Sequence, residues 1–206
     1  MQASHYAAVR GFPRRAAGED FYLLNKLRKT GQVVSLPQPQ LAICSRQSTR
    51  APFGTGAAVN DLLQQSDPSS ATIFYHPRSF LLLRELLQWL PQYAEACFSQ
   101  QLSCDWKQHL KTHYRHRQQL PLVYSALESI GFANGLQHSL KQSRDAMQFK
   151  RQMDSWMDGF RTMKWLHCLR DQCDHGLPEN GDCRHLNAAD YQRECAALDI
   201  AAVTLR

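Results

Sequence analysis

Hydrophobic residues recur at helical spacing along most of this chain. The first such run starts at an adjacent pair of acids, Glu19 and Asp20, and ends before Gly31. Its apolar positions are Phe21, Leu23, Leu24 and Leu27. Acids in the first turn, bases in the last turn and a following glycine are typical of a helix. The pattern therefore predicts a helix that begins at the acid pair.

Two short β-like runs follow this helix, at 32–36 and 41–45, and a proline-rich turn separates them. Apolar runs bounded by turn residues predict short strands. A loop comes next, in which Arg46 and Arg50 flank two hydroxyl residues. Helix, strands and loop together predict a small α/β unit over residues 1–56.

From residue 57 onward the pattern is helical, without a substantial sheet. Apolar residues at helical spacing predict helices near 57–65, 80–90, 103–116, 122–130, 132–140, 143–173 and 187–198. Pro91 is expected to interrupt the second of these, and Gly159 is a position at which the longest pattern could divide. We therefore expect a mainly α chain with an all-helical domain over residues 57–206.

Composition indicates a folded chain with a modest positive charge. Of the 206 residues 43% are hydrophobic, which is enough for a core and argues against disorder. The net charge of +6 fits a partner that carries phosphate: a nucleotide diphosphate, a nucleic acid or an anionic lipid surface. No apolar run approaches the roughly 18 residues that span a bilayer, so no transmembrane segment is expected.

Seven cysteines are scattered along the chain, and the first fifteen residues lack the apolar core of a secretory signal. We therefore expect free thiols in the cytoplasm, with peripheral attachment to the inner membrane as an alternative. Cysteines and histidines gather within 167–185, but their spacing matches no familiar zinc site. Unrelated thiols and surface histidines are the favoured interpretation, and no metal ligand is assigned.

Two motifs near the start of the chain carry a resemblance to a known family. Arg10-Gly11-Phe12 is followed by Gly18-Glu19-Asp20-Phe21-Tyr22-Leu23-Leu24-Asn25-Lys26-Leu27. This order resembles the acceptor-side part of bacterial inverting glycosyltransferases of family 2, which have the GT-A fold. In that family a Gly-Gly-Phe segment precedes a helix that opens with Glu-Asp. The resemblance implies that residues 1–56 are the C-terminal part of a GT-A-like domain.

The resemblance also implies that the chain is one portion of a larger enzyme. The sugar-nucleotide half of the family, which ends in an Asp-x-Asp metal motif, would precede Met1, and this chain contains no Asp-x-Asp. The complete enzyme is expected to use Mn²⁺ or Mg²⁺, with ligands mostly upstream. It is expected to move a hexosyl group from a nucleotide-sugar donor to an acceptor hydroxyl with inversion. This chain alone is expected to be inactive.

Inverting transfer needs a base that takes the proton of the acceptor hydroxyl. Near a helix N-terminus, the dipole and a second carboxylate have opposing effects on the pKa of a carboxyl group. By resemblance, Asp20 is the expected base and Glu19 a positioning residue, while Gly11 and Phe12 are expected to contribute to substrate binding. Taken without the resemblance, the two acids are ordinary first-turn residues that compensate the helix dipole.

Two further features leave alternatives open. Arg46 and Arg50 are candidates to hold the leaving diphosphate, since guanidinium binds phosphate oxygens bidentately, but a solvated basic loop fits equally well. The basic segment 109–117 fits phosphate contact or a solvated helix face. The competing class of function is a non-enzymatic helical interaction module with a basic nucleic-acid- or lipid-binding surface; nucleic acid is the less favoured partner.

Overall fold

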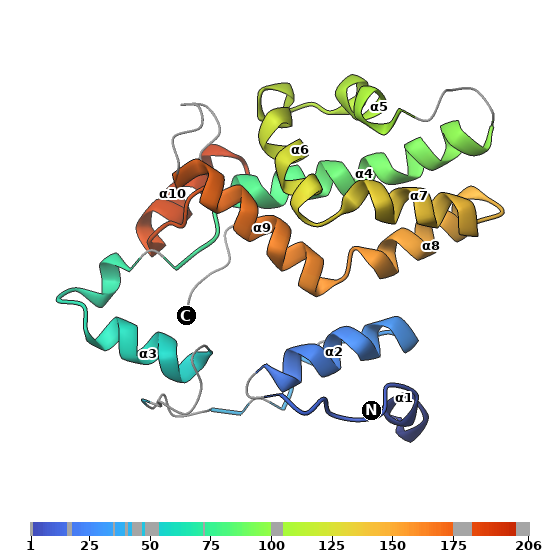
Figure 1. Cartoon of the computed structure of the whole chain (residues 1–206). Coiled ribbons are helices and arrows are strands. Elements are labelled where there is room, and N and C mark those ends of the chain that lie inside the picture. Colours follow the sequence, from blue (N-terminus) through green and yellow to red (C-terminus); the bar gives the residue numbers. More distant parts are fainter. Residues whose placement is uncertain are drawn as a thin grey trace. The chain divides into compact units, whose positions relative to one another are not determined.

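A computed structural model describes most of the chain as helix. The described residues are 2–15, 18–34, 36–39, 41–42, 47, 54–71, 73–99, 105–174 and 183–200. They form ten α-helices and two 3₁₀ helices, and their only β pairing is an isolated bridge between Phe74 and Leu186. The chain divides into two compact units, Met1–Ala71 and Thr72–Arg206 (Figure 1). The prediction of a mainly α chain is therefore confirmed.

The N-terminal unit, Met1–Ala71, contains three α-helices and one 3₁₀ turn in its described part. They are α1 (Ala3–Ala8), α2 (Glu19–Thr30), α3 (Thr55–Leu63) and η1 (Pro68–Ser70). The helix predicted at the acid pair is confirmed as α2, which ends before Gly31. His5 Nδ1 lies 3.0 Å from Thr30 Oγ1 and joins α1 to the end of α2. Contacts place α3 in this unit, whereas the sequence analysis placed the domain boundary at residue 56.

The described residues of the two β-like runs form no strand. The residues described there are 32–34, 36, 41 and 42. Their large apolar side chains are exposed, from 48% at Val33 to 86% at Leu41. A strand is stable only when a neighbouring strand pairs with its backbone, and no such neighbour lies beside these residues in the described part of the unit. The α/β character expected for residues 1–56 is therefore not seen there.

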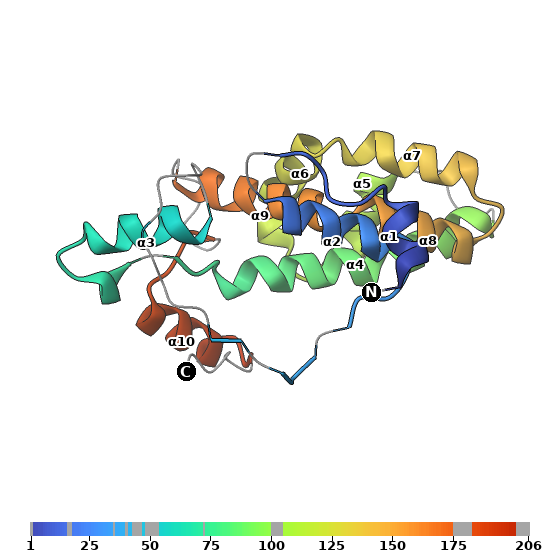
Figure 2. The same cartoon turned by 90° about the horizontal axis from the view of Figure 1, so that it is seen from below.

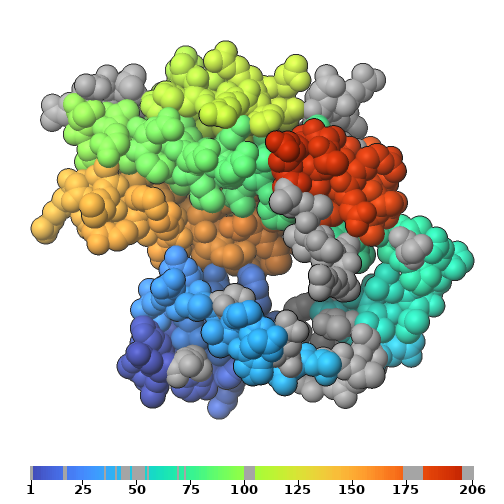
Figure 3. All heavy atoms as spheres, turned by 180° about the vertical axis from the view of Figure 1, so that it is seen from behind, coloured from blue at the N-terminus to red at the C-terminus, as the bar shows by residue number. Residues whose placement is uncertain are grey.

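The C-terminal unit, Thr72–Arg206, is a bundle of seven α-helices and one 3₁₀ turn in its described ranges. They are α4 (Pro77–Phe98), α5 (Trp106–His113), η2 (Arg117–Gln119), α6 (Leu120–Ser129), α7 (Phe132–Gln142), α8 (Ala146–Trp156), α9 (Gly159–Asp174) and α10 (Ala188–Ala197). Helix α4 packs against α5 and α8, while α6 packs against α9 (Figures 1 and 2). Helix α10 packs against α4, and both are visible in Figure 3.

The core of this unit is formed by large side chains from α4 to α9. The largest fully buried ones include Trp165, Tyr93, Tyr114, Phe132, Phe149, Leu82, Leu86 and Leu127. Within the long helical pattern of 143–173, the side chains of Phe149, Met153 and Trp165 are fully buried in this core. The longest pattern divides at Gly159, because α8 ends at Trp156 and α9 begins at Gly159.

Pro91 lies inside α4 and does not interrupt it. A proline in a helix interior removes one backbone donor and costs about 3 kcal/mol relative to alanine. The residues on both sides of it are buried in the same core: Leu86 and Leu90 before it, Tyr93 and Ala94 after it. Burial of these side chains keeps both halves of α4 in line, so the predicted interruption is wrong.

Two polar side chains tie α4 to the segment that follows α5. The buried Tyr114 Oη donates to Leu82 O at 2.7 Å. Glu85 accepts from the backbone N–H of Arg115 at 3.2 Å, and its Oε1 lies 2.6 Å from His116 Nδ1. Burial raises the pKa of Tyr114, so the phenol stays protonated and remains a donor.

We expect Tyr114→Phe to lower the free energy of unfolding of the C-terminal unit by about 0.5–1.5 kcal/mol, because one buried hydrogen bond is lost. Tyr124→Phe is the matched control, since it removes an exposed bond, from Tyr124 Oη to Lys107 O at 2.9 Å. Urea unfolding followed by circular dichroism measures both. Equal losses in the two variants would contradict the assigned role of Tyr114.

A second polar contact makes the stability of this unit depend on pH. Trp89 Nε1 donates to His109 Nδ1 at 2.8 Å, which requires the neutral imidazole, and His109 stacks on His113 with ring centroids 4.1 Å apart. Burial, followed by the charge of His113, lowers the pKa of His109. The pKa of His167 on α9 is lowered by burial and by Arg170.

Because these two pKa values are lower in the folded chain, the unfolded chain binds more protons below pH of about 6.5. We expect the free energy of unfolding to fall as the pH drops from about 7.5 to about 5. His109→Gln keeps an acceptor without a titrating group and should reduce that fall, whereas His138→Gln, on the exposed face of α7, should not. Identical pH profiles for the two variants would rule out this role of His109.

Candidate functional site

The acid pair lies at the start of α2, directly after a left-handed glycine. Gly18 has φ of +72°, a conformation that L-residues other than glycine rarely adopt, and its carbonyl accepts from Tyr22 N at 3.0 Å. Asp20 Oδ1 accepts from the N–H of Phe21 at 2.7 Å. The side chains of Glu19 and Asp20 are exposed. Gly18 thus turns the chain so that two adjacent carboxylates open a helix at its positive end.

Gly11 and Phe12 lie in the turn that follows α1. Gly11 has φ of +69°, and a Cβ at this position would lie 3.0 Å from Tyr6 Oη. The Tyr6 ring makes an edge-to-face contact with the Phe12 ring, with centroids 6.3 Å apart. The turn is therefore ordered against α1, and within the described contacts neither residue touches the acid pair.

Arg15 provides a contact between this turn region and α2 that the sequence analysis did not assign. Its guanidinium lies 4.3 Å from the centroid of the Tyr22 ring, a cation–π contact beside the first turn of α2. The arginines predicted to bind diphosphate, Arg46 and Arg50, lie outside the described residues. Their role stays a prediction.

The N-terminal unit buries few hydrophobic side chains. Those that the structure describes as buried are Val9, Leu23 and Ala71. By contrast, Phe12 is 54% exposed and Leu24, on the acid-pair helix, is 52% exposed. A unit with so little apolar burial has little hydrophobic stabilisation of its own.

The left-handed glycine before the acid pair can be tested directly. Gly18→Ala places a Cβ in a left-handed conformation at a cost of about 1–2 kcal/mol, so hydrogen exchange of the α2 amides should become roughly five- to thirty-fold faster. Gly18→Asn should have a smaller effect, because asparagine tolerates this conformation better. The same acceleration in both variants would show that the left-handed backbone is not what makes glycine necessary.

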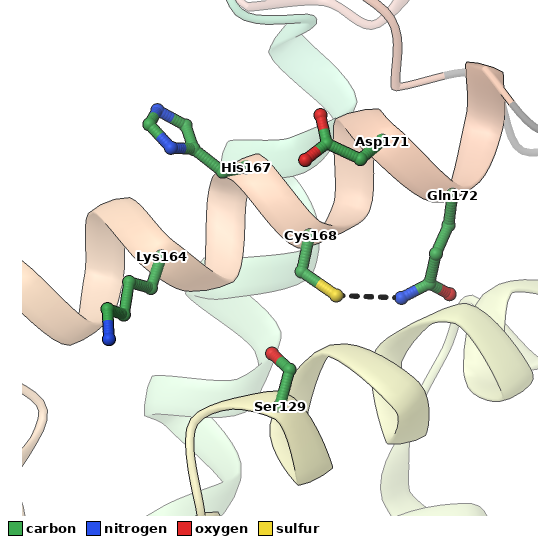
Figure 4. A pocket seen from close by; sticks show the side chains of 6 residues that line it. All are labelled: Ser129, Lys164, His167, Cys168, Asp171 and Gln172. Atoms are coloured by element: carbon green, nitrogen blue, oxygen red, sulfur yellow. Dashed lines mark hydrogen bonds between the residues drawn. The ribbon is translucent and has the colours of Figure 1, made fainter.

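A second candidate site is a pocket of about 340 Å³ between the end of α6 and one face of α9. Figure 4 shows its lining residues: Ser129, Lys164, His167, Cys168, Asp171 and Gln172. Cys168 Sγ accepts from Gln172 Nε2 at 2.8 Å, and both side chains lie on the side of α9 that faces Ser129. The sequence pointed to His167 and Cys168 only as soft ligands. Ser129 had no signal, because only tertiary packing brings α6 beside α9.

The chemistry of this pocket is limited by the directions of its side chains. His167 projects away from Cys168 (Figure 4) and is hydrogen-bonded through Nε2 to Tyr75 Oη. A nucleophile and its base must lie within hydrogen-bond reach, so this arrangement is not a Cys–His catalytic pair. Asp171 forms an ion pair with Arg170, with 2.6 Å between Arg170 Nη2 and Asp171 Oδ1. The pocket therefore offers a mainly apolar concavity without a convergent catalytic group.

Two further properties were searched for in the described part of the chain. No group of three or more His, Cys, Asp or Glu side chains gathers there in a way that could hold a metal ion. None of the helices found in those ranges is both long enough and apolar enough to cross a membrane.

Comparison of the chain with protein families, with curated proteins and with solved structures found no match. The case for a glycosyltransferase therefore depends on the two motifs near the start of the chain and on the geometry of the acid pair.

Proposed function

We propose that this chain is the acceptor-side, C-terminal portion of an inverting glycosyltransferase, which moves a hexosyl group from a nucleotide-activated sugar to an acceptor hydroxyl. The observation that carries the proposal is the start of α2. A left-handed Gly18 precedes two adjacent, exposed carboxylates, Glu19 and Asp20, in the first turn of a helix. This geometry fits the Glu-Asp helix of the family that the motifs resemble.

In the proposed reaction Asp20 accepts the proton of the acceptor hydroxyl while the oxygen attacks the anomeric carbon and the nucleoside diphosphate leaves. The N–H of Phe21 holds Asp20 Oδ1 and so fixes the carboxylate, which can receive the proton on Oδ2. Glu19 positions the pair, and Arg46 and Arg50 bind the departing diphosphate.

An upstream nucleotide-binding half is the partner that the N-terminal unit would need. The exposed apolar side chains of Phe12, Leu24, Val34 and Leu41 support this part of the proposal, since a covering domain would bury them. Neighbouring strands from that half would also pair with the runs 32–36 and 41–45 and complete the α/β remnant of a GT-A-like domain.

The metal of the complete enzyme is assigned to the upstream half as well. In the described residues Glu19 and Asp20 are adjacent acids without a third ligand beside them, which does not fit a Mn²⁺ or Mg²⁺ site built by this chain alone. In the proposed reaction, therefore, no residue of this chain acts through a bound metal ion.

The alternative, a helical interaction module with an anionic partner, has one observation in its favour. Lys111, Arg115 and Arg117 are exposed near the end of α5, and none of them forms an ion pair within the described ranges. Such a patch suits a phosphate-bearing surface. The DNA upstream of Met1 separates the two proposals: a βαβ pattern ending in Asp-x-Asp favours the transferase, and an unrelated gene with its own stop favours the module.

Asp20→Asn tests the proposed base. In the complete enzyme the variant should keep donor affinity while turnover falls by about 10²- to 10⁴-fold, because asparagine keeps the shape of the side chain and loses its basicity. Glu19→Gln should be milder if Glu19 only positions the pair. Sugar transfer and donor affinity are measured for both variants. The same measurements are made on this chain without the upstream half, and this chain alone should neither bind the donor tightly nor transfer sugar.

Asp61→Asn is the matched control, because Asp61 is an exposed acid on α3 outside the motif. Its turnover should equal that of the parent enzyme. Turnover of Asp20→Asn near the parent rate would end the assignment of the base and most of the case for this family.

A further inference from the structure

Two cysteines of the C-terminal unit are in direct contact although ten positions separate them. The backbone N–H of Cys183 donates to Cys173 Sγ at 3.2 Å. Cys173 lies in the last turn of α9 and is half-buried, while Cys183 is fully buried. Both are free thiols in this structure. This contact places the sulfur of Cys173 beside the backbone of Cys183, and the two thiols are also hydrogen-bonded to each other.

The two cysteines lie on segments that the fold must hold together. Cys183 begins the segment that pairs Leu186 with Phe74, through backbone hydrogen bonds of 3.0 and 2.8 Å, and that leads into α10. Cys173 is the penultimate residue of the long helix α9. A bond between the two sulfurs would therefore fasten the α10 segment to α9.

The environments of the two thiols are unequal. The thiol of Cys183 is hydrogen-bonded to Cys173 and is buried, and both effects raise the pKa of Cys183, while Ser79 and Arg78 oppose them. Cys183 therefore keeps its proton, and the sulfur of Cys173 accepts hydrogen bonds from it. The half-buried Cys173 is the sulfur that a reagent from solvent can reach.

We propose that Cys173 and Cys183 form a reversible disulfide by exchange with a small-molecule disulfide such as oxidised glutathione. The Cys173 thiolate attacks one sulfur of the small disulfide and forms a mixed disulfide, and the first small thiolate leaves. Cys183 then gives up its proton and attacks Cys173 Sγ, and the second small thiolate leaves. The two protein thiols are oxidised, and the small disulfide is reduced to two thiols, which take up the two protons.

Two other described cysteines are less suited to this exchange. Cys168 lies on the face of α9 beside α6, where its sulfur accepts from Gln172. Cys195 is buried on α10 and is hydrogen-bonded to Tyr191. The contact between Cys173 and Cys183 therefore distinguishes these two cysteines from Cys168 and Cys195. The proposed disulfide does not depend on the proposed sugar transfer.

The test uses the full chain in buffers of increasing oxidised-to-reduced glutathione ratio. Peptide mapping without reductant should find Cys173 linked to Cys183, with a loss of two hydrogens that excess reductant restores. The oxidised chain should also melt about 5–10 °C higher, because the cross-link reduces the freedom of the unfolded chain.

Cys168→Ser is the matched control, since it removes a half-buried thiol from the same helix and should leave the cross-link unchanged. Cys173→Ser and Cys183→Ala should each abolish the cross-link and the rise in melting temperature, and circular dichroism checks that both fold. If a variant does not fold, the peptide map of the unmodified chain still shows whether Cys173 is linked to Cys183. A stable glutathione adduct on Cys173 without a cross-link, or Cys173 linked to another cysteine, would overturn the proposal.

Discussion

The C-terminal unit depends on the burial of one face of α4. Leu82, Leu86, Trp89 and Tyr93 line this face and are at most 2% exposed. Each such side chain contributes about 1.5–3 kcal/mol of hydrophobic free energy when it leaves water. Helices α5, α8 and α10 contact α4 directly. The same burial keeps α4 continuous through Pro91, and it supports the polar contacts of Glu85 and Tyr114, because the segments that carry these groups are already held in place.

The N-terminal unit has the opposite balance. Its described helices are joined by a few specific contacts, such as His5 with Thr30 and Arg15 with Tyr22, and by little apolar burial. Specific contacts at an exposed surface contribute little free energy. The candidate base and its neighbour therefore lie on the unit whose described residues bury fewer apolar side chains. This agrees with the proposal that a nucleotide-binding half completes the unit and the catalytic site together.

The two proposals concern sites on different units, and different physical effects act at each site. At α2, backbone conformation and helix dipole act on an exposed carboxylate pair, and the substrate would come from solvent. At the end of α9, burial and hydrogen bonding act on a thiol pair, and the product would be a covalent tie within the fold. The thiol pair belongs to the C-terminal unit and the acid pair to the N-terminal unit, so separate measurements test the two proposals.

The helical nature of the chain and the start of α2 could be predicted from the sequence alone, because helical periodicity, first-turn acids and glycine stops act within a few residues. It also placed the glycine and the two acids of the candidate site. Tertiary structure decided what depends on distant neighbours. Pro91 stays within α4 because both its flanks are buried, and the expected strands at 32–36 and 41–45 are not seen in their described residues, where a pairing partner is lacking. The sequence showed that Cys173 and Cys183 belong to one cluster of cysteines and histidines, but only packing brings the two into contact, and only packing forms the pocket between Ser129 and α9.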